Sequence, residues 1–536
     1  MKKLKLVCVA IAMAGAAPTF AGGLLTNTNQ HVAFNRMMSR EASIGIDGVY
    51  YNPAGVVFMG EGHHLAINWQ LAYQTRTINN DYKLFTNNVN NPITPRDFKG
   101  KAFAPVIPSF QYAYNKGKWS FQANFSLTGG GGKCTFDDGL GSFEKIVSET
   151  AIAACGLAGV VDQTLGNKLG QPGMEMFTSD QAFGKTGKYS FNSYMHGRQY
   201  YYGLSAGAAY KFCDNFSAFL GVRGVYALTN YYGYVENINV GNMPLYKVLD
   251  PTKENAANIE LSCDQTGVGF TPIIGVDYKT GRWNFSAKYE FKTRIRLKNK
   301  SVNQTPSIGN LPANLANQMT GILTARYQQA GLPLEQAKQQ AENTTNAVLN
   351  DPTVGATMIG LKTQFDQKLN KAIGEYEDGK KIAGDIPAYL ALGIGYSPVD
   401  AVRVNVGFHW FDDKNATSYN NRNKELKRGT LEYNAGVEVD VNKKITLSTG
   451  WQNTNYGLSD EYMDDKSFVV GSNSAAIGGV YHINKKMDLN VAYFHTFYQH
   501  KKTSETVQLA ADKSIVYNSD YTRNNNVFAV GLDINF

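Results

Sequence analysis

Apolar and polar residues alternate along many segments of the chain. Between Trp283 and Phe291 every second residue is apolar, and the residues between them are polar, two of them basic or acidic on either side of Tyr289. Side chains point to opposite faces along an extended strand, so this segment has one apolar face and one polar face. A helix would scatter both sets around its circumference. The segment is therefore predicted as a strand.

The same alternation recurs along the rest of the chain and predicts fourteen strands, an even number. The segments are 65–73, 110–114, 119–127, 202–212, 216–234, 270–278, 283–291, 388–396, 402–410, 431–441, 445–451, 477–483, 487–497 and 528–536. Many approach the roughly 9–11 residues that a tilted strand needs to cross a bilayer.

The connections between these segments alternate in length. Tight turns, such as residues 115–118, 279–282 and 484–486, alternate with long connections, of which 131–197 and 298–385 are the longest. This sorting is typical of an outer-membrane barrel, whereas a soluble sandwich has shorter strands and no reason to sort its loops. The fold class predicted for residues 63–536 is all-β, a fourteen-stranded antiparallel transmembrane β-barrel.

The two longest connections carry a different period. Apolar residues recur at three- and four-residue spacing over 143–165 and 361–376, and a Gln-, Asn- and Ala-rich helical stretch covers 313–350. These patterns predict amphipathic helices in extracellular loops. Their apolar faces suit either a folded cap on the barrel mouth or a landing site for a hydrophobic ligand.

Composition narrows the class of protein. Only 18% of the 536 residues are charged, 12% are aromatic, and no apolar run of about 20 residues follows residue 21. A helical membrane protein and a disordered chain are both disfavoured. The formal net charge of +8 carries no argument for a nucleic-acid partner, and none is predicted.

The N-terminus has the features of an export signal. Lys2, Lys3 and Lys5 precede an apolar stretch at 6–17, and Thr19-Phe20-Ala21 fits a cleavage site. Residues 1–21 are therefore predicted to be a secretory signal peptide. Residues 22–62 fit no strand repeat, yet they are too apolar for a free tail. We expect them to be buried in the barrel lumen.

One motif in this segment carries a family resemblance. Residues 43–55 read Ser-Ile-Gly-Ile-Asp-Gly-Val-Tyr-Tyr-Asn-Pro-Ala-Gly and precede the first strand. They resemble the hatch signature of the FadL/TodX family of outer-membrane transporters of long-chain fatty acids and other hydrophobic compounds. The residues matched to that motif are Asp47, Tyr50, Tyr51, Asn52, Pro53, Ala54 and Gly55.

The resemblance implies fourteen strands, an N-terminal hatch that plugs the lumen, and helical extracellular loops after the third and seventh strands. It also implies a kinked third strand beside a lateral hole through which ligand leaves into the membrane. Trp119–Leu127 has no Pro or Gly to mark that kink; Gly129–Gly132 follow it, and Pro105 and Pro108 disturb the second strand instead. The alternating C-terminal strand ending at Phe536 resembles the signal read by the barrel-assembly machinery, a further expected partner beside outer-membrane lipid.

Basic residues on the lumen side are the candidate ligand-binding groups. Strand parity points Arg223, Lys288, Lys292 and Arg403 into the lumen, where they could hold a ligand carboxylate through charge-assisted bonds. The alternative is that these residues pair with lumen acids or anchor the hatch. One bulge would reset the parity.

The pattern is relevant to three functions. Passive transport of hydrophobic compounds, above all long-chain fatty acids, is favoured over a barrel enzyme such as a lipase or protease, and over a general porin that an apolar plug would block. No HExxH motif or Cys/His pair with metal spacing occurs in the sequence, so no metal or cofactor is expected. Cys134, Cys155 and Cys263 lie in the expected extracellular loops, which allows one disulfide, most simply Cys134 to Cys155, although the sequence does not determine the pairing; the alternative is free thiols. The expected location is the bacterial outer membrane, with both ends of the mature chain in the periplasm.

Overall fold

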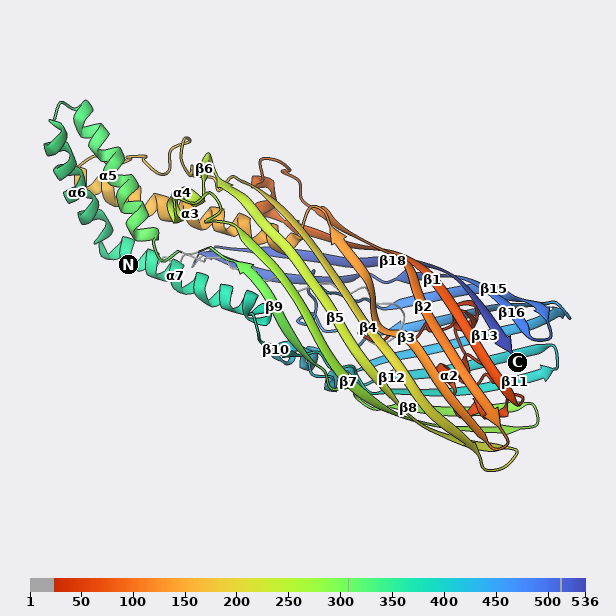
Figure 1. Cartoon of the computed structure of the whole chain (residues 1–536). Coiled ribbons are helices and arrows are strands. Elements are labelled where there is room, and N and C mark those ends of the chain that lie inside the picture. Colours follow the sequence, from red (N-terminus) through yellow and green to blue (C-terminus); the bar gives the residue numbers. More distant parts are fainter. Residues whose placement is uncertain (1–23, 307, 511–512) are drawn as a thin grey trace.

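The barrel is one closed antiparallel sheet with a helical cap at one end (Figure 1). The computed structural model describes residues 24–306, 308–510 and 513–536, with the side chains of 131, 364–373 and 510 left out. The predicted signal peptide lies outside the described residues. Strand β1 pairs with both β2 and β18, which closes the ring.

The strands are longer than the alternating segments predicted. They are β1 Gly62–Tyr82, β2 Arg96–Lys116, β3 Trp119–Phe136, β4 Tyr189–Lys211, β5 Phe216–Val240, β6 Met243–Pro244, β7 Ile259–Thr280, β8 Trp283–Glu290, β9 Arg296–Gln304, β10 Lys381–Ala383, β11 Tyr389–Val399, β12 Val402–Phe411, β13 Thr430–Asn442, β14 Ile445–Asn455, β15 Ser472–Asn484, β16 Met487–Tyr498, β17 Lys501–Ala510 and β18 Lys513–Asn535.

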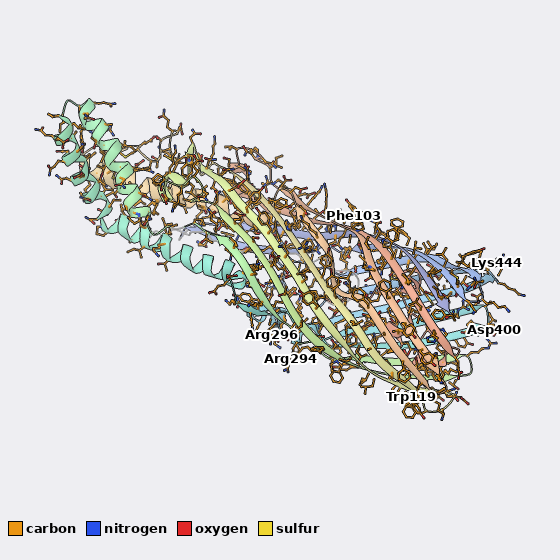
Figure 2. All side chains as sticks on the ribbon, in the orientation of Figure 1. Phe103, Trp119, Arg294, Arg296, Asp400 and Lys444 are labelled. Atoms are coloured by element: carbon orange, nitrogen blue, oxygen red, sulfur yellow. The ribbon has the colours of Figure 1, made fainter. Side chains whose placement is uncertain are left out.

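The strand number agrees with the prediction. Three barrel strands are each broken into two pieces, namely β8 with β9, β10 with β11, and β16 with β17, and β6 is a two-residue appendage of β5. The barrel therefore has fourteen strands, as predicted. Its tight turns gather at the end opposite the cap, where Figure 2 shows Trp119, Asp400 and Lys444.

Large apolar side chains cover the outer wall. Trp69, Phe121, Leu220 and Phe270 are between 42% and 71% exposed, and Phe103 projects from the outer face of β2. Their strand neighbours Asn68, Gln122, Gly221 and Thr271 face inward. This apolar-out, polar-in alternation is the pattern of a barrel in lipid.

The cap consists of helices from the two longest connections, as predicted. They are α3 Gly141–Leu169, α5 Leu311–Gln329, α6 Leu334–Leu349, α7 Pro352–Ile373 and the short 3₁₀ helix η3 Gly374–Tyr376. Shorter connections contain α4 Tyr246–Leu249 and the 3₁₀ helices η2 Lys83–Asn87, η4 Asp413–Asn415 and η5 Tyr419–Glu425. By length and composition α3 could cross a membrane, but 61% of its most apolar window is buried within the cap.

The N-terminal segment lies inside the barrel. It contains α1 Val32–Met37, α2 Gly48–Tyr51 and η1 Gly55–Phe58, and α1 packs against β14, β15 and β16. Gly436 and Gly450 face the backbone carbonyl of Met37, where a Cβ atom would clash. Small residues on the wall thus let the segment lie directly against the strands.

Candidate ligand path through the barrel

Asn52 joins the N-terminal motif to the barrel wall. Its amide nitrogen donates to the Asp277 carboxylate on β7 over 2.5 Å, and its oxygen accepts the backbone N–H of Gly55 over 3.1 Å. Asn284 also donates to Asp277, over 2.9 Å. A Cβ atom on Gly55 would collide with the Asn52 side chain, which explains the glycine at this position.

Two further bonds tie the motif to other strands. Gln122 of β3 donates to the carbonyl of Pro53, and Ser217 of β5 donates to the carbonyl of Ala54, each over 2.7 Å. Within the segment, Asp47 accepts two bonds from the Arg40 guanidinium, at 2.7 and 3.0 Å. The motif is therefore an anchor of the plug rather than an exposed binding loop.

The tyrosine pair of the motif holds the start of the segment. The hydroxyl of Tyr50 donates to the carbonyl of Asn27 over 3.0 Å, and that of Tyr51 donates to the carbonyl of Thr28 over 2.7 Å. Phe34 stacks on Tyr51, with ring centroids 5.1 Å apart. These bonds keep residues 27–34 folded back against the motif.

The basic residues predicted to bind ligand have protein partners. Arg223 makes a two-bond contact with Glu290, at 2.5 and 3.0 Å. Lys288 bonds the same carboxylate over 2.9 Å and donates to the carbonyl of Tyr50 over 2.6 Å. This arrangement matches the alternative stated from the sequence, in which lumen charges pair with each other and anchor the hatch.

Lys292 and Arg403 also bond to protein groups. Arg403 bonds Glu438 over 2.7 Å and Asp440 over 2.8 Å. Lys292 donates to the carbonyl of Asn415 over 3.1 Å. Its predicted lumen parity does not continue along the strand, because β8 ends at Glu290 and the buried positions afterwards are odd-numbered. A break in the ladder has reset the parity.

The ladder between β2 and β3 is interrupted. Ala102 pairs with Cys134 and Phe110 with Phe125, and the register shift between these pairs leaves 103–109 and 126–133 out of the β2–β3 ladder. Pro105 and Pro108 cannot donate ladder bonds. The glycines at 129–132, which follow the segment predicted as a strand, fall inside the interruption, and Gly130 adopts a φ of +70°.

The start of the N-terminal segment fills part of this interruption. The backbone N–H of Asn27 donates to Thr128 over 3.0 Å, and its side-chain amide donates to the carbonyl of Leu127 over 3.1 Å. From the other edge, Ser109 donates to the carbonyl of Gln30 over 2.6 Å. Movement of residues 27–30 would thus expose unpaired strand backbone at the same place in the wall.

A second feature is an apolar pocket in the cap. It is a cavity of about 130 Å³ between α3, the ends of β5 and β7, and the start of α5. Its walls include Val147, Leu157, Val161, Leu245, Ile259 and Leu315. Its almost wholly apolar walls suit the apolar part of a hydrophobic ligand.

Below the cap, two arginines form a basic pair that the sequence did not predict. Arg76 of β1 lies directly opposite Arg523 of β18, and both side chains are buried in the lumen. Both donate to the same Gln74 oxygen, over 3.1 and 2.8 Å. Ile78, two residues above, belongs to the apolar core of the cap, and Ala72, four residues below, belongs to the core around the plug.

Two aromatic rings lie next to the Arg523 side chain of this pair. The Arg523 guanidinium lies 5.7 Å from the Phe468 ring centroid and 5.6 Å from that of Tyr498. The planar guanidinium of Arg523 thus lies over two rings, and guanidinium groups are well suited to bind a carboxylate. The pair is a candidate anion-binding group between the cap and the plug.

The turn end of the lumen is polar. Cavities of about 720 and 330 Å³ share Arg40, Arg403 and Glu438 among their walls and lie beside the segment around Asp47. A hydrophobic ligand leaving by this route would pass charged groups. The interrupted wall between β2 and β3 is a second route out of the lumen.

A buried histidine in the lumen lies between two carboxylates. His409 bonds Glu41 over 2.7 Å through Nε2 and Glu432 over 2.8 Å through Nδ1. With both ring nitrogens facing carboxylates, His409 has the wrong partners for a Ser-His-Asp triad. Among the described residues, no group of three His, Cys, Asp or Glu side chains could hold a metal ion. Cys134, Cys155, Cys213 and Cys263 are free thiols.

Comparisons with known proteins place the fold. No family model matches the chain, and no curated protein matches it. Among solved structures, a Pseudomonas aeruginosa FadL homologue superposes with a TM-score of 0.56 at 14% identity, covering 98% of this chain and 100% of the other. A TodX monoaromatic hydrocarbon channel, a deltaS2S3 mutant, gives 0.50 at 13% identity, covering 96% and 100%.

The chain therefore has the fold of the FadL/TodX channels over nearly its whole length. The resemblance predicted from residues 43–55 is confirmed at this level.

Proposed function

We propose that the protein is an outer-membrane channel that passes hydrophobic compounds inward without an energised cycle. The observation that carries the proposal is the order of surfaces along the lumen. An apolar pocket in the cap is followed by the Arg76–Arg523 pair, then by the plug, then by the interrupted wall between β2 and β3. Neighbours of the same fold, described as a FadL homologue and a hydrocarbon channel, support this class of function.

Long-chain fatty acids are the ligands we propose. An apolar tail suits the cap pocket, and a carboxylate suits the two guanidinium groups between the cap and the plug. A hydrocarbon would use the pocket but gain nothing from the arginines.

Residues 22–62 would act as the hatch. Displacement of 27–30 from the β2–β3 interruption would open a lateral exit into the membrane, while the motif from Asp47 to Gly55 stays anchored. We further propose that the tight turns and both ends of the mature chain face the periplasm, and that the strand ending at Phe536 is read during barrel assembly.

The enzyme and porin alternatives are less well supported. His409 lacks a nucleophile partner, and the plug occupies part of the lumen where a porin has water.

A binding series of saturated fatty acids against the purified barrel tests the ligand class. Each buried methylene contributes roughly 0.8 kcal/mol, so affinity should climb with chain length until the pocket is filled. Affinity independent of chain length would contradict binding in an apolar pocket.

A further inference from the structure

The seventh barrel strand changes which face it presents to the outside. Along β8 the exposed side chains are odd-numbered and apolar, as at Trp283 and Phe285. Residues 291–295 interrupt the strand, and along β9 the exposed positions are even-numbered. Ile295 and Leu297 turn inward and pack in an apolar cluster with Tyr201. The reset therefore moves the following basic residues from the lumen to the outer wall.

These residues form an outer basic ladder, which comprises Arg294, Arg296, Lys298, Lys300 and, across from Lys298 on β10, Lys381. All five are exposed. Figure 2 shows Arg294 and Arg296 together at the outer edge of the barrel, below the cap.

The ladder begins at the upper edge of the apolar wall. Arg294 follows Trp283, which starts β8 at a tight turn, by about the 9–11 residues that a strand needs to cross the hydrocarbon core. On the neighbouring strand β7, Val268 and Phe270 are 63% and 71% exposed. Gly267 and Gly269 of β7 touch the backbones of Arg296 and Arg294, which places this apolar pair beside the ladder.

Acidic residues offset only part of this charge. Asp385 accepts a bond from Arg296 over 2.9 Å, but its own side chain is 1% exposed while that of Arg296 is 53% exposed. Asp264 faces Lys300 across the β7–β9 ladder. Arg294, Lys298 and Lys381 add further positive charge on the same wall.

We propose that the outer basic ladder binds the phosphate groups of a phosphorylated lipid in the outer leaflet. Basic side chains above an apolar band fit a ligand with anionic head and acyl chains, because the two parts contact both surfaces at once. Arg294 and Arg296 provide planar donors that match phosphate oxygens, and the lysines add point charges. The inference rests on the proposed outer-membrane location but is independent of what the lumen carries.

The test is binding of a bis-phosphorylated acyl glucosamine disaccharide (lipid A) to the purified protein in neutral detergent. The ladder variant combines Arg294→Gln, Arg296→Gln, Lys298→Gln and Lys300→Gln. The matched control removes the same number of charges at the opposite end of the barrel, through Lys443→Gln, Lys444→Gln, Lys485→Gln and Lys486→Gln. Unboiled gel migration establishes that each variant is an assembled barrel.

We expect the ladder variant to bind about tenfold more weakly than the wild type and the control to bind like the wild type. Dephosphorylated lipid should bind wild type and ladder variant equally. An Arg294→Lys, Arg296→Lys variant, which keeps the charge, should retain most of the affinity and serves if the ladder variant does not assemble.

Three results would overturn the proposal: equal loss in the ladder and control variants, no loss in the ladder variant, or complete displacement of the lipid by inorganic phosphate at matched concentration. The last result would indicate a site for soluble anions. Fatty-acid binding by the ladder variant should be unchanged, so failure of the transport proposal would show separately, as absence of fatty-acid binding in every variant.

Discussion

The side-chain amide of Asn52 donates to the carboxylate of Asp277, 225 positions away, over 2.5 Å. This bond joins the plug to the inside of β7, and both residues are buried. A buried polar group that loses its hydrogen-bond partner keeps its desolvation cost. Breaking the bond between Asn52 and Asp277 should therefore destabilise the position of the plug.

Replacing Asn52 by Ala should loosen the plug without preventing barrel assembly. The loss leaves Asp277 with a missing donor, at a cost of about 1–3 kcal/mol. We expect faster hydrogen exchange across residues 43–58 and unchanged exchange in β13 and β14. Asn52→Asp, which adds a like charge beside Asp277, should loosen the segment further. Exchange rates that match the wild type in both variants would show that this bond does not hold the plug.

Removal of the arginine pair should cost affinity for acids but not for neutral analogues. In an Arg76→Gln, Arg523→Gln variant, a long-chain acid should bind about tenfold more weakly, since charge-assisted bonds exceed neutral ones. The alcohol of equal chain length should bind as it does to the wild type. Arg403→Gln, at the turn end, is the control. Equal weakening for acid and alcohol would assign the pair a structural role.

Arg223→Gln distinguishes the two basic sites in the lumen. This guanidinium binds Glu290 beside Tyr50, so its loss should lower the free energy of unfolding and leave acid selectivity intact. Loss of acid selectivity at constant stability would restore Arg223 as a head-group ligand.

The buried carboxyl of Asp413 makes the stability of the folded protein depend on pH. Burial raises the pKa of this carboxyl to about 6, although the backbone N–H groups of Leu24 and Thr430 donate to it. An acid whose pKa is raised by folding binds more protons in the folded state, so stability falls as pH rises from about 4 to 6 and then levels off. The loss is about 3 kcal/mol.

Urea unfolding of the barrel across this pH range measures that slope. Asp413→Asn should flatten the profile, and Asp412→Asn, at the neighbouring position, should leave it in place. A profile that keeps its slope in the Asp413 variant would locate the titration elsewhere.

Strand alternation predicted the barrel and its turns because lipid on one side and polar groups on the other impose a period of two. It did not predict where strands end. The first strand was expected to stop at Tyr73 and the last to begin at Phe528, yet β1 continues to Tyr82 and β18 begins at Lys513. Above the apolar band the outer face no longer needs apolar side chains and the inner face carries both polar and apolar ones, so the alternation fades while the hydrogen bonds continue. Arg76 and Arg523 lie in these extensions and were therefore missed.

The break in the seventh strand could not be predicted from the alternation of apolar and polar residues, for a different reason. Residues 283–300 alternate without a visible interruption, and only the three-dimensional register shows that Thr293 and Ile295 turn inward. By contrast, the glycines at 129–132 and the prolines at 105 and 108 were visible signals of the β2–β3 interruption. These residues indicate a gap between β2 and β3 only once the register of that strand pair is known, and the sequence alone did not specify the register.

Uptake of a labelled long-chain fatty acid, by cells that lack a channel of their own, tests the central claim most directly. Ala154 lines the cap pocket, whereas Ala325 lies on the exposed face of α5. Ala154→Trp should fill the pocket and reduce uptake toward the level of cells without the protein, while Ala325→Trp should transport like the wild type, with equal amounts of assembled barrel. Wild-type uptake no faster than in cells without the protein would contradict the account.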